Sequence, residues 1–300
     1  MKILVSGASG LIGSALVPAL VAAGHSVERL VRDRARAVGG DLFWNPSTGE
    51  LDPTGLEPFD AVVHLAGENI AAGRWTAGQK DRILNSRVQG TRTIAESLAK
   101  LSGKTRTLIS ASAIGFYGNR GDELLDESSL PGHDFLAEVC QAWEAATQPA
   151  AAAGVRVVNT RFGVVLSAKG GALKKMLLPF RLGLGGKIGS GRQFMSWVVL
   201  DDVVGAIAHC LNHASLSGPV NIVAPNPATN LEFTKTLGRV IARPTIFPMP
   251  AFAARLAFGQ MADELLLASQ RVQPAKLQSA GYAFQYPQLE QGLRHVLASR

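Results

Sequence analysis

Three glycines, at positions 7, 10 and 13, lie between a short apolar run and a longer alanine-rich stretch near the start of the chain. Residues 3–6 are too few for a helix and predict a buried strand, whereas residues 11–23 have the pattern of a helix. Glycine at such a turn permits a tight bend, close packing of helix on strand, and close approach of backbone N–H groups to a phosphate. An ordinary turn is the alternative, but strand, spacing and helix together favour a dinucleotide site. The expected cofactor contacts in this segment come from Gly7, Ser9, Gly10, Leu11, Ile12 and Gly13.

The end of the second predicted strand, residues 26–31, indicates which dinucleotide to expect. An acidic residue here would hold the ribose 2′-hydroxyl of NAD, but the strand is followed by Arg32, Asp33 and Arg34. Arg32 can make charge-assisted hydrogen bonds to a 2′-phosphate, and Arg34 can add positive field. The other interpretation is that Asp33 accepts the hydroxyl while Arg32 is simply exposed. The sequence therefore favours NADP (NADPH), with NAD as the less favoured cofactor.

Short apolar runs alternate with longer alanine-rich stretches through the first half of the chain. The runs are continuous in Val, Ile and Leu, which is typical of strands buried on both faces of a parallel sheet. This alternation predicts an α/β fold of the Rossmann type, a doubly wound parallel sheet. Pro244, Pro248 and Pro250 interrupt the C-terminal part, which predicts a second, smaller domain. The expected strands are residues 3–6, 26–31, 61–65, 107–110, 155–160 and 220–224; the expected helices are 11–23, 79–100, 136–153 and 202–212; the expected domains are 1–225, with a substrate-side loop at about 166–195, and 226–300.

Composition excludes several classes of protein. With 47% hydrophobic and 18% charged residues, the chain fits a packed globular protein rather than a disordered one. No apolar stretch approaches the ~20 residues that cross a membrane, and the N-terminus runs into the glycine motif without a signal sequence. Cys140 and Cys210 match no metal-ligand or redox spacing. We therefore expect reduced thiols, no metal site, no membrane partner and a cytoplasmic location.

The net charge of +7 raises the question of a nucleic-acid partner. The basic residues are scattered, and no zinc-finger or RNA-binding signature accompanies them, so a solvated basic surface is expected instead. Residues 169–192 hold six Lys or Arg side chains and no acidic one. This segment favours an anionic ligand.

Further motifs along nearly the whole chain resemble a known family. His64-Leu65-Ala66-Gly67 and the segment from Ser110 to Tyr117-Gly118, with the glycine spacing, resemble the extended short-chain dehydrogenase/reductase superfamily. Residues 134–144, 189–197, 259–263, 270–272 and 286–287 resemble an atypical branch, the "epimerase family" proteins with a C-terminal domain of unknown function. The resemblance implies further cofactor contacts from Leu65, Ala66, Gly67, Arg87 and Ser110.

In typical members a serine, an asparagine and a Tyr-x-x-x-Lys pair carry the chemistry, and the lysine lowers the pKa of the tyrosine. Counting back from Glu144, the resemblance places Leu136 at the tyrosine position and Cys140 at the lysine position. Arg87 takes the asparagine position, and Ser112 alone remains. Loss of a positioned general acid costs ~10²–10⁴ in rate, so ordinary ketoreductase chemistry is expected to be slow or absent.

Several residues are candidates for the remaining chemistry. Ser112 is expected to orient the substrate, and Tyr117, Glu68 or water to handle the proton. Cys140 would face the nicotinamide, although a small core hydrophobe is the commoner role for such a residue. Packing is the alternative for Tyr117, and capping or loop packing for Glu68. Arg87 fits a structural ion pair and a substrate-anion contact equally well.

For several other residues the sequence predicts a position in the fold but no catalytic role. His64 follows a buried strand and is expected as a hydrogen-bonded scaffold residue. Gln193, Ser196 and Trp197 are expected at the substrate wall, with packing as the alternative for the tryptophan. Asp201-Asp202 precedes an apolar run and is expected to cap a helix.

Two functions of different class follow. The first is an NADP(H)-dependent oxidoreductase or nucleotide-sugar epimerase acting on a small carbonyl or hydroxyl compound, for which the basic segment 169–192 favours an anionic one. The second is a non-catalytic NADP(H) sensor or regulatory protein that kept the cofactor fold and lost the chemistry. The sequence gives neither the substrate nor the oligomeric state.

Overall fold

The computed structural model describes residues 1–101 and 107–298, and these residues form two compact units. Each unit is assembled from three segments, so the chain passes between the units several times. The first unit consists of Met1–Ser112, Val139–Thr160 and Val204–Val220; the second consists of Ala113–Glu138, Arg161–Val203 and Asn221–Arg300. The expected division between residues 225 and 226 remains a prediction.

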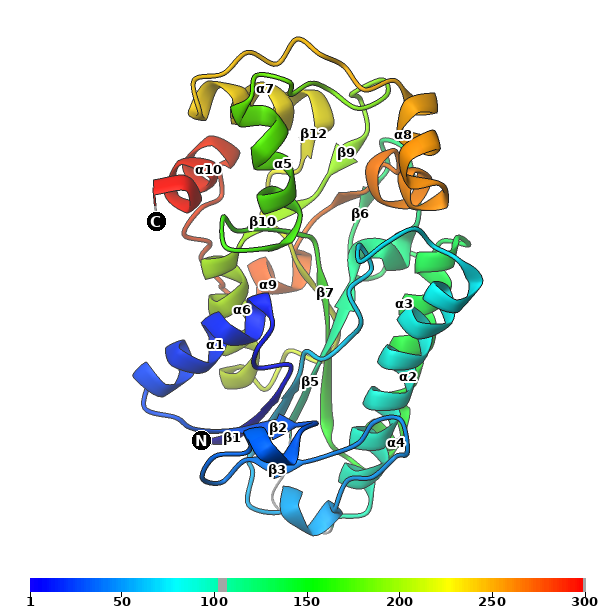
Figure 1. Ribbon diagram of the computed structural model, residues 1–300. Helices are drawn as coiled ribbons and strands as arrows, with labels where there is room; N and C mark the ends of the chain where they lie inside the picture. The colour runs from blue at the N-terminus through cyan, green and yellow to red at the C-terminus, as the bar shows by residue number, and fades with distance from the viewer. Residues whose placement is uncertain (102–106, 299–300) are drawn as a thin grey trace. The chain divides into compact units, whose positions relative to one another are not determined.

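A seven-stranded parallel sheet forms the centre of the first unit (Figure 1). In spatial order its strands are β11 (Gly218–Ile222), β7 (Arg156–Phe162), β5 (Thr107–Ala113), β4 (Ala61–His64), β1 (Lys2–Ser6), β2 (Ser26–Val31) and β3 (Leu42–Phe43). β1 pairs in parallel with β2 and with β4, and β4 pairs in parallel with β5. The chain leaves β1 toward β2 and later returns to its other side, so the strand order reverses between β1 and β4. Sheets of this kind bind their ligands beyond the carboxyl ends of the strands at that point.

Helices cover both faces of this sheet. They are α1 (Leu11–Ala22), α2 (Ala77–Ala99), α3 (Phe135–Ala145), α4 (Gln148–Ala152) and α6 (Leu200–Asn212). α1 and α6 lie on one face, and α2, α3 and α4 on the other (Figure 1). The expected α/β fold with a doubly wound sheet is confirmed. Among the helices within the described ranges, none has the length and apolar character to cross a membrane.

The single helix expected over residues 136–153 is wrong, because the chain forms α3 and then a separate α4. Pro149 lies in the first turn of α4, where its missing N–H is harmless. In a continuous helix the same proline would clash with the carbonyl of residue 145. α3 therefore ends before Thr147, and α4 restarts the helical path.

In the part of the second unit that the structure describes, there are three two-stranded sheets and several short helices. Trp197, Phe233 and Leu293 are fully buried in one of its cores. Its sheets are β8 (Val164–Leu166) with β10 (Trp197–Val199), β9 (Phe194–Met195) with β12 (Ala228–Thr229), and β6 (Leu124–Leu125) with β13 (Arg271–Val272); its helices are α5 (Gly171–Arg181), α7 (Asn230–Val240), α8 (Ala251–Phe258), α9 (Ala275–Ser279) and α10 (Leu289–Ala298).

The capping role expected of Asp201 and Asp202 is wrong. α6 begins at Leu200, so both aspartates lie inside its first turn. Asp202 is fully buried, and its carboxylate accepts hydrogen bonds from the backbone N–H groups of Gln285 (2.7 Å) and Tyr286 (3.0 Å). Burial raises the pKa of this carboxyl, and the hydrogen bonds oppose that shift. Asp202 therefore anchors the C-terminal segment rather than a helix end.

Candidate functional site

The glycine turn after β1 has the geometry that its sequence predicts. Gly7 has a φ of +69°, and the N–H of Gly10 donates to the Gly7 carbonyl at 3.0 Å. A Cβ on Gly13 would lie 2.3 Å from the Gly7 carbonyl oxygen, and one on Gly7 would lie 2.7 Å from the carbonyl carbon of Leu65. Side chains cannot be placed at these positions, so the turn and α1 approach each other as closely as backbone allows.

The start of α1 leaves its N–H groups available. Gly10 is the N-cap and provides no side-chain acceptor, and the first turn holds no acidic residue. The first N–H groups of a helix have no partner within it, and they favour an anion. The residues present therefore fit the pyrophosphate of a dinucleotide.

A buried hydrogen bond supports this turn from below. Ser6 Oγ lies 2.6 Å from His64 Nδ1, and the N–H of Leu65 donates to Ser6 Oγ at 3.2 Å. Burial lowers the pKa of His64 to about 4, so the imidazole is neutral at pH 7. His64 thus holds the end of β4 beside the end of β1, in agreement with its expected scaffold position.

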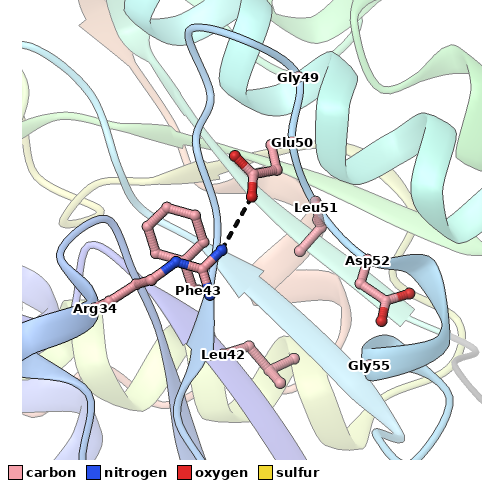
Figure 2. Close-up of a pocket in the computed structure, with 8 residues that line it drawn as sticks. All are labelled: Arg34, Leu42, Phe43, Gly49, Glu50, Leu51, Asp52 and Gly55. Atoms are coloured by element: carbon pink, nitrogen blue, oxygen red, sulfur yellow. Dashed lines mark hydrogen bonds and ion pairs between the residues drawn. The ribbon is translucent and has the colours of Figure 1, made fainter.

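Beyond β2 the two arginines have different surroundings. Asp33 caps a single 3₁₀ turn by accepting from the N–H of Ala35 at 3.0 Å. Arg34 pairs with Glu50 at 3.1 Å and stacks on the ring of Phe43, with its guanidinium carbon 3.8 Å from the ring centroid (Figure 2). Arg32 is exposed. Arg34 is therefore held by Phe43 and Glu50, whereas Arg32 projects into solvent.

Arg34 and Phe43 form part of the wall of a pocket (Figure 2). Its volume is about 600 Å³, and charged groups from Arg34, Glu50 and Asp52 alternate around it with apolar side chains. The pocket lies between β3 and the following loop, next to the end of β2. Its other lining residues are Leu42, Gly49, Leu51 and Gly55.

Arg87 belongs to α2, and its side chain lies over Gly67, which is in the loop after β4. A Cβ on Gly67 would lie 3.5 Å from the guanidinium carbon of Arg87, which itself lies 4.9 Å from the ring centroid of Trp143. Burial lowers the pKa of Arg87, and the nearby Cys140 and Glu68 side chains oppose this. Two predicted site residues, Glu68 and Cys140, thus lie close enough to Arg87 to influence its guanidinium.

Ser112 has a partner that the sequence did not predict. Its hydroxyl donates to Glu144 Oε1 at 2.7 Å, and the serine itself is 2% exposed. Glu144 follows Cys140 by four residues, so both occupy the same side of α3. This helical spacing is the signal that could have identified Glu144. Leu136 and Cys140, at the positions of the usual tyrosine and lysine, are both buried.

Tyr117 is part of a buried polar network in the second unit. Its hydroxyl donates to Asn221 Oδ1 at 2.7 Å and accepts from Arg161 Nη1 at 3.0 Å. The Arg161 guanidinium also lies 3.4 Å from the ring centroid of Phe116. Burial raises the pKa of Tyr117 to about 12, and the side chain has no exposed surface. These contacts are those of a packed residue.

The residues expected at the substrate wall are also buried. Gln193 donates through Nε2 to the carbonyls of Ile188 and Leu266, both at 3.0 Å. Ser196 donates to the carbonyl of Gln270 at 2.8 Å, and the indole N–H of Trp197 donates to another main-chain carbonyl. Their polar groups join strands to loops within the second unit, and for Trp197 this fits the packing alternative.

Residues 3–223 match the model of the NAD dependent epimerase/dehydratase family, and residues 249–296 match a domain of unknown function, DUF1731. The chain belongs to the NAD dependent epimerase/dehydratase family. The expected resemblance to extended short-chain dehydrogenases and their atypical branch is confirmed.

Relatives extend over the whole chain. Epimerase family protein Mb2239 of Mycobacterium bovis is 47% identical over 294 residues, covering 98% of this chain and 97% of its own. Epimerase family protein SDR39U1 of Bos taurus is 38% identical over 303 residues, covering 99% and 100%. Among solved structures, human epimerase family protein SDR39U1 with NADPH is 34% identical, with a TM-score of 0.90 and full coverage of both chains. A nucleoside-diphosphate sugar epimerase from Corynebacterium glutamicum is 40% identical with a TM-score of 0.82, covering 99% of this chain and 58% of its own.

Proposed function

We propose that the chain is an NADP(H)-dependent oxidoreductase acting on a small carbonyl or hydroxyl compound. The observation that carries the proposal is the Ser112–Glu144 hydrogen bond, which lies in the same unit as the glycine turn. When bound, the cofactor would supply or accept the hydride at its nicotinamide C4. The chain's own residues would then have to hold the substrate oxygen and move one proton.

Arg32 is proposed to hold the 2′-phosphate of NADP(H). It is exposed beyond the end of β2, whereas Asp33 is engaged in a cap and Arg34 is stacked on Phe43. The human relative whose structure includes NADPH supports the same cofactor.

Binding titrations followed by intrinsic fluorescence test the cofactor. Arg32→Ala should raise the Kd for NADPH by about 10–100-fold, because a charge-assisted hydrogen bond contributes ~1.5–3 kcal/mol. Its Kd for NADH should not change. The exposed Arg92 on α2 gives the matched control, since Arg92→Ala removes the same charge elsewhere in the first unit. Equal affinities of the unaltered chain for NADPH and NADH would refute the assignment.

Ser112 and Glu144 are proposed to form the proton path. In the oxidative direction the Ser112 hydroxyl gives its proton to the Glu144 carboxylate and takes the proton of the substrate hydroxyl. The substrate carbon would lose a hydride to the bound cofactor and become a carbonyl carbon, so the substrate would be oxidised and the cofactor reduced. In the reductive direction both transfers reverse. Glu68, close to Arg87, is proposed as the alternative acceptor of that single proton.

A non-catalytic NADP(H)-binding protein is the second candidate, and one observation favours it. Ser112, Tyr117 and Cys140 are 2%, 0% and 3% exposed, so three of the four predicted catalytic residues offer little surface to a substrate. On this hypothesis the Ser112–Glu144 hydrogen bond is purely structural.

Glu144→Gln separates the two candidates. The experiment measures NADPH consumption with a panel of small aldehydes, ketones and 2-oxo acids, and product formation from UDP-sugars, which epimerisation converts without net use of cofactor. For the oxidoreductase, Glu144→Gln should lower turnover by about 10²-fold or more and abolish one limb of its pH profile, while the Kd for NADPH stays the same. Tight NADPH binding without turnover on any compound would favour the sensor.

The proposal also covers the binding partner and the compartment. We propose that the substrate is a small molecule and that the protein is located in the cytoplasm. Cys140 and Cys210 are both buried, and within the described residues neither forms a disulfide, which fits a reducing compartment.

A further inference from the structure

Two segments of the second unit run side by side and form a double ribbon of irregular backbone. The Nε of Arg243 donates to the carbonyl of Arg181 at 3.0 Å, and the N–H of Met249 donates to the carbonyl of Lys187 at 2.9 Å. A Cβ on Gly186 would lie 1.9 Å from the carbonyl oxygen of Phe247, so the two backbones are in direct contact. The second of these segments is the long coil between α7 and α8 in Figure 1.

Large apolar side chains project from this ribbon and from the helices next to it. Leu182, Leu184, Ile246 and Phe247 belong to the ribbon itself, and Phe252 lies one helical turn before Leu256 on α8. Single exposed apolar residues are ordinary, but a group on adjacent segments indicates an interaction surface. We call this group the apolar surface; its members, between 54% and 77% exposed, are Leu178, Leu182, Leu184, Ile246, Phe247, Phe252 and Leu256.

Every charged residue in the two stretches that carry the apolar surface is basic. Residues 171–192 and 233–261 contain no Asp or Glu. Arg239 and Arg255 are ion-paired with acidic residues from outside these stretches. The basic residues of the two stretches are Lys174, Lys175, Arg181, Lys187, Arg192, Lys235, Arg239, Arg243 and Arg255.

We propose that the apolar surface and its basic surroundings dock the protein on an anionic membrane surface. Leu, Ile and Phe side chains that project among Lys and Arg are suited to insert between lipid headgroups while the cations contact the anionic groups. Such a contact lies on the bilayer and requires no spanning helix. It therefore replaces the earlier expectation of no membrane partner, which rested on the lack of a spanning stretch. The proposal is independent of the reaction proposed above.

Two other occupants fit the surface less well. A second copy of the chain would bring basic residues against basic residues, which is unfavourable. An acidic protein would match the charge, and the Phe and Arg side chains are common in protein interfaces, but such interfaces are rich in Tyr and Trp as well and depleted in Lys. Residues 171–192 and 233–261 contain neither Tyr nor Trp, and they contain Lys174, Lys175, Lys187 and Lys235. The composition therefore favours a bilayer.

Co-sedimentation of the full chain with vesicles tests the proposal. The chain should bind vesicles of phosphatidylcholine with about 30% phosphatidylglycerol, and should bind phosphatidylcholine alone at least about tenfold more weakly. Raising NaCl from about 0.05 M to about 0.5 M should weaken the binding, since salt screens the exposed charges. Equal partitioning to both vesicles, or none to either, would overturn the proposal.

A double variant identifies the surface that binds. Phe247→Ser with Leu256→Ser should lower the vesicle partition coefficient at least about tenfold, because each lost side chain removes apolar area from the bilayer. Its Kd for NADPH should stay unchanged, which shows that the chain is still folded. Leu130, 75% exposed in the same unit, gives the matched control, and Leu130→Ser should bind like the unaltered chain. Equal losses in both variants, or light scattering that shows a dimer dissociated only by the double variant, would contradict membrane docking.

Discussion

Gly13→Ala tests whether both the stability of the fold and the affinity for cofactor depend on the close approach of α1 to the glycine turn. The added Cβ would lie 2.3 Å from the Gly7 carbonyl oxygen and 2.7 Å from the Cα of Ala8. Ordinary contacts of this kind are roughly 3.5 Å, so α1 must move away by about 1 Å. Overpacking of this kind costs ~1–3 kcal/mol, which lowers the melting temperature by roughly 2–10 °C at this size. The same shift pulls the first N–H groups of α1 away from the pyrophosphate, and each hydrogen bond lost to a charged group costs ~1.5–3 kcal/mol.

Thermal unfolding and NADPH titration of the same samples measure both effects. The Kd for NADPH should rise about 10–100-fold in the Gly13→Ala variant. Gly78→Ala is the matched control, because its Cβ would meet only Arg82 Nη1, at 3.8 Å, and alanine favours α2. A Gly13→Ala variant with an unchanged melting temperature and an unchanged Kd would refute the reasoning.

Three further changes probe the scaffold around the site. Arg156 donates to the carbonyls of Cys210 and Leu216 at 3.0 and 2.8 Å. Arg156→Met should therefore lower the free energy of unfolding by about 1–3 kcal/mol, and an unchanged melting temperature in thermal scans would contradict this. His64 has a pKa of about 4 in the fold against 6.5 in the unfolded chain, so its contribution is complete above pH 6.5 and is lost as the pH falls toward 4. That loss is about 3 kcal/mol, and unfolding of His64→Gln as a function of pH should lack that part of the acid sensitivity. Asp202→Asn leaves one acceptor oxygen for two backbone N–H groups, so limited proteolysis should cleave the C-terminal segment faster than in the unaltered chain.

The cofactor half of the fold could be predicted because its signals are local. The glycine turn, the strand before it and the helix after it occupy Lys2–Ala22, and each is visible within a window of a few residues. The helical pattern of residues 136–153 was equally clear, but it could not show that Pro149 would start a new helix. Apolar periodicity continues through such a break, because α3 and α4 each bury one side.

The partners of the candidate site residues could not be predicted, because they are distant in the sequence. Tyr117 and Asn221 are separated by 104 positions, and Asp202 is bonded to backbone more than 80 positions away. A conspicuous tyrosine after a serine-bearing strand has the same local sequence whether it faces a substrate or a buried arginine. Only the tertiary contact with Arg161 distinguishes the two.

The position of Glu144 on α3 suits a proton path that does not need the usual tyrosine and lysine. Leu136 and Glu144 are eight residues apart, which is about 12 Å along a helix. In the structure the Ser112 hydroxyl directs its proton to Glu144, two helical turns after the usual tyrosine position. Leu136 and Cys140 are then left to exclude water rather than to transfer protons. Reintroducing the pair as Leu136→Tyr with Cys140→Lys should therefore not raise turnover, and a gain in carbonyl reduction by that double variant would show that the proton path does not run through Glu144.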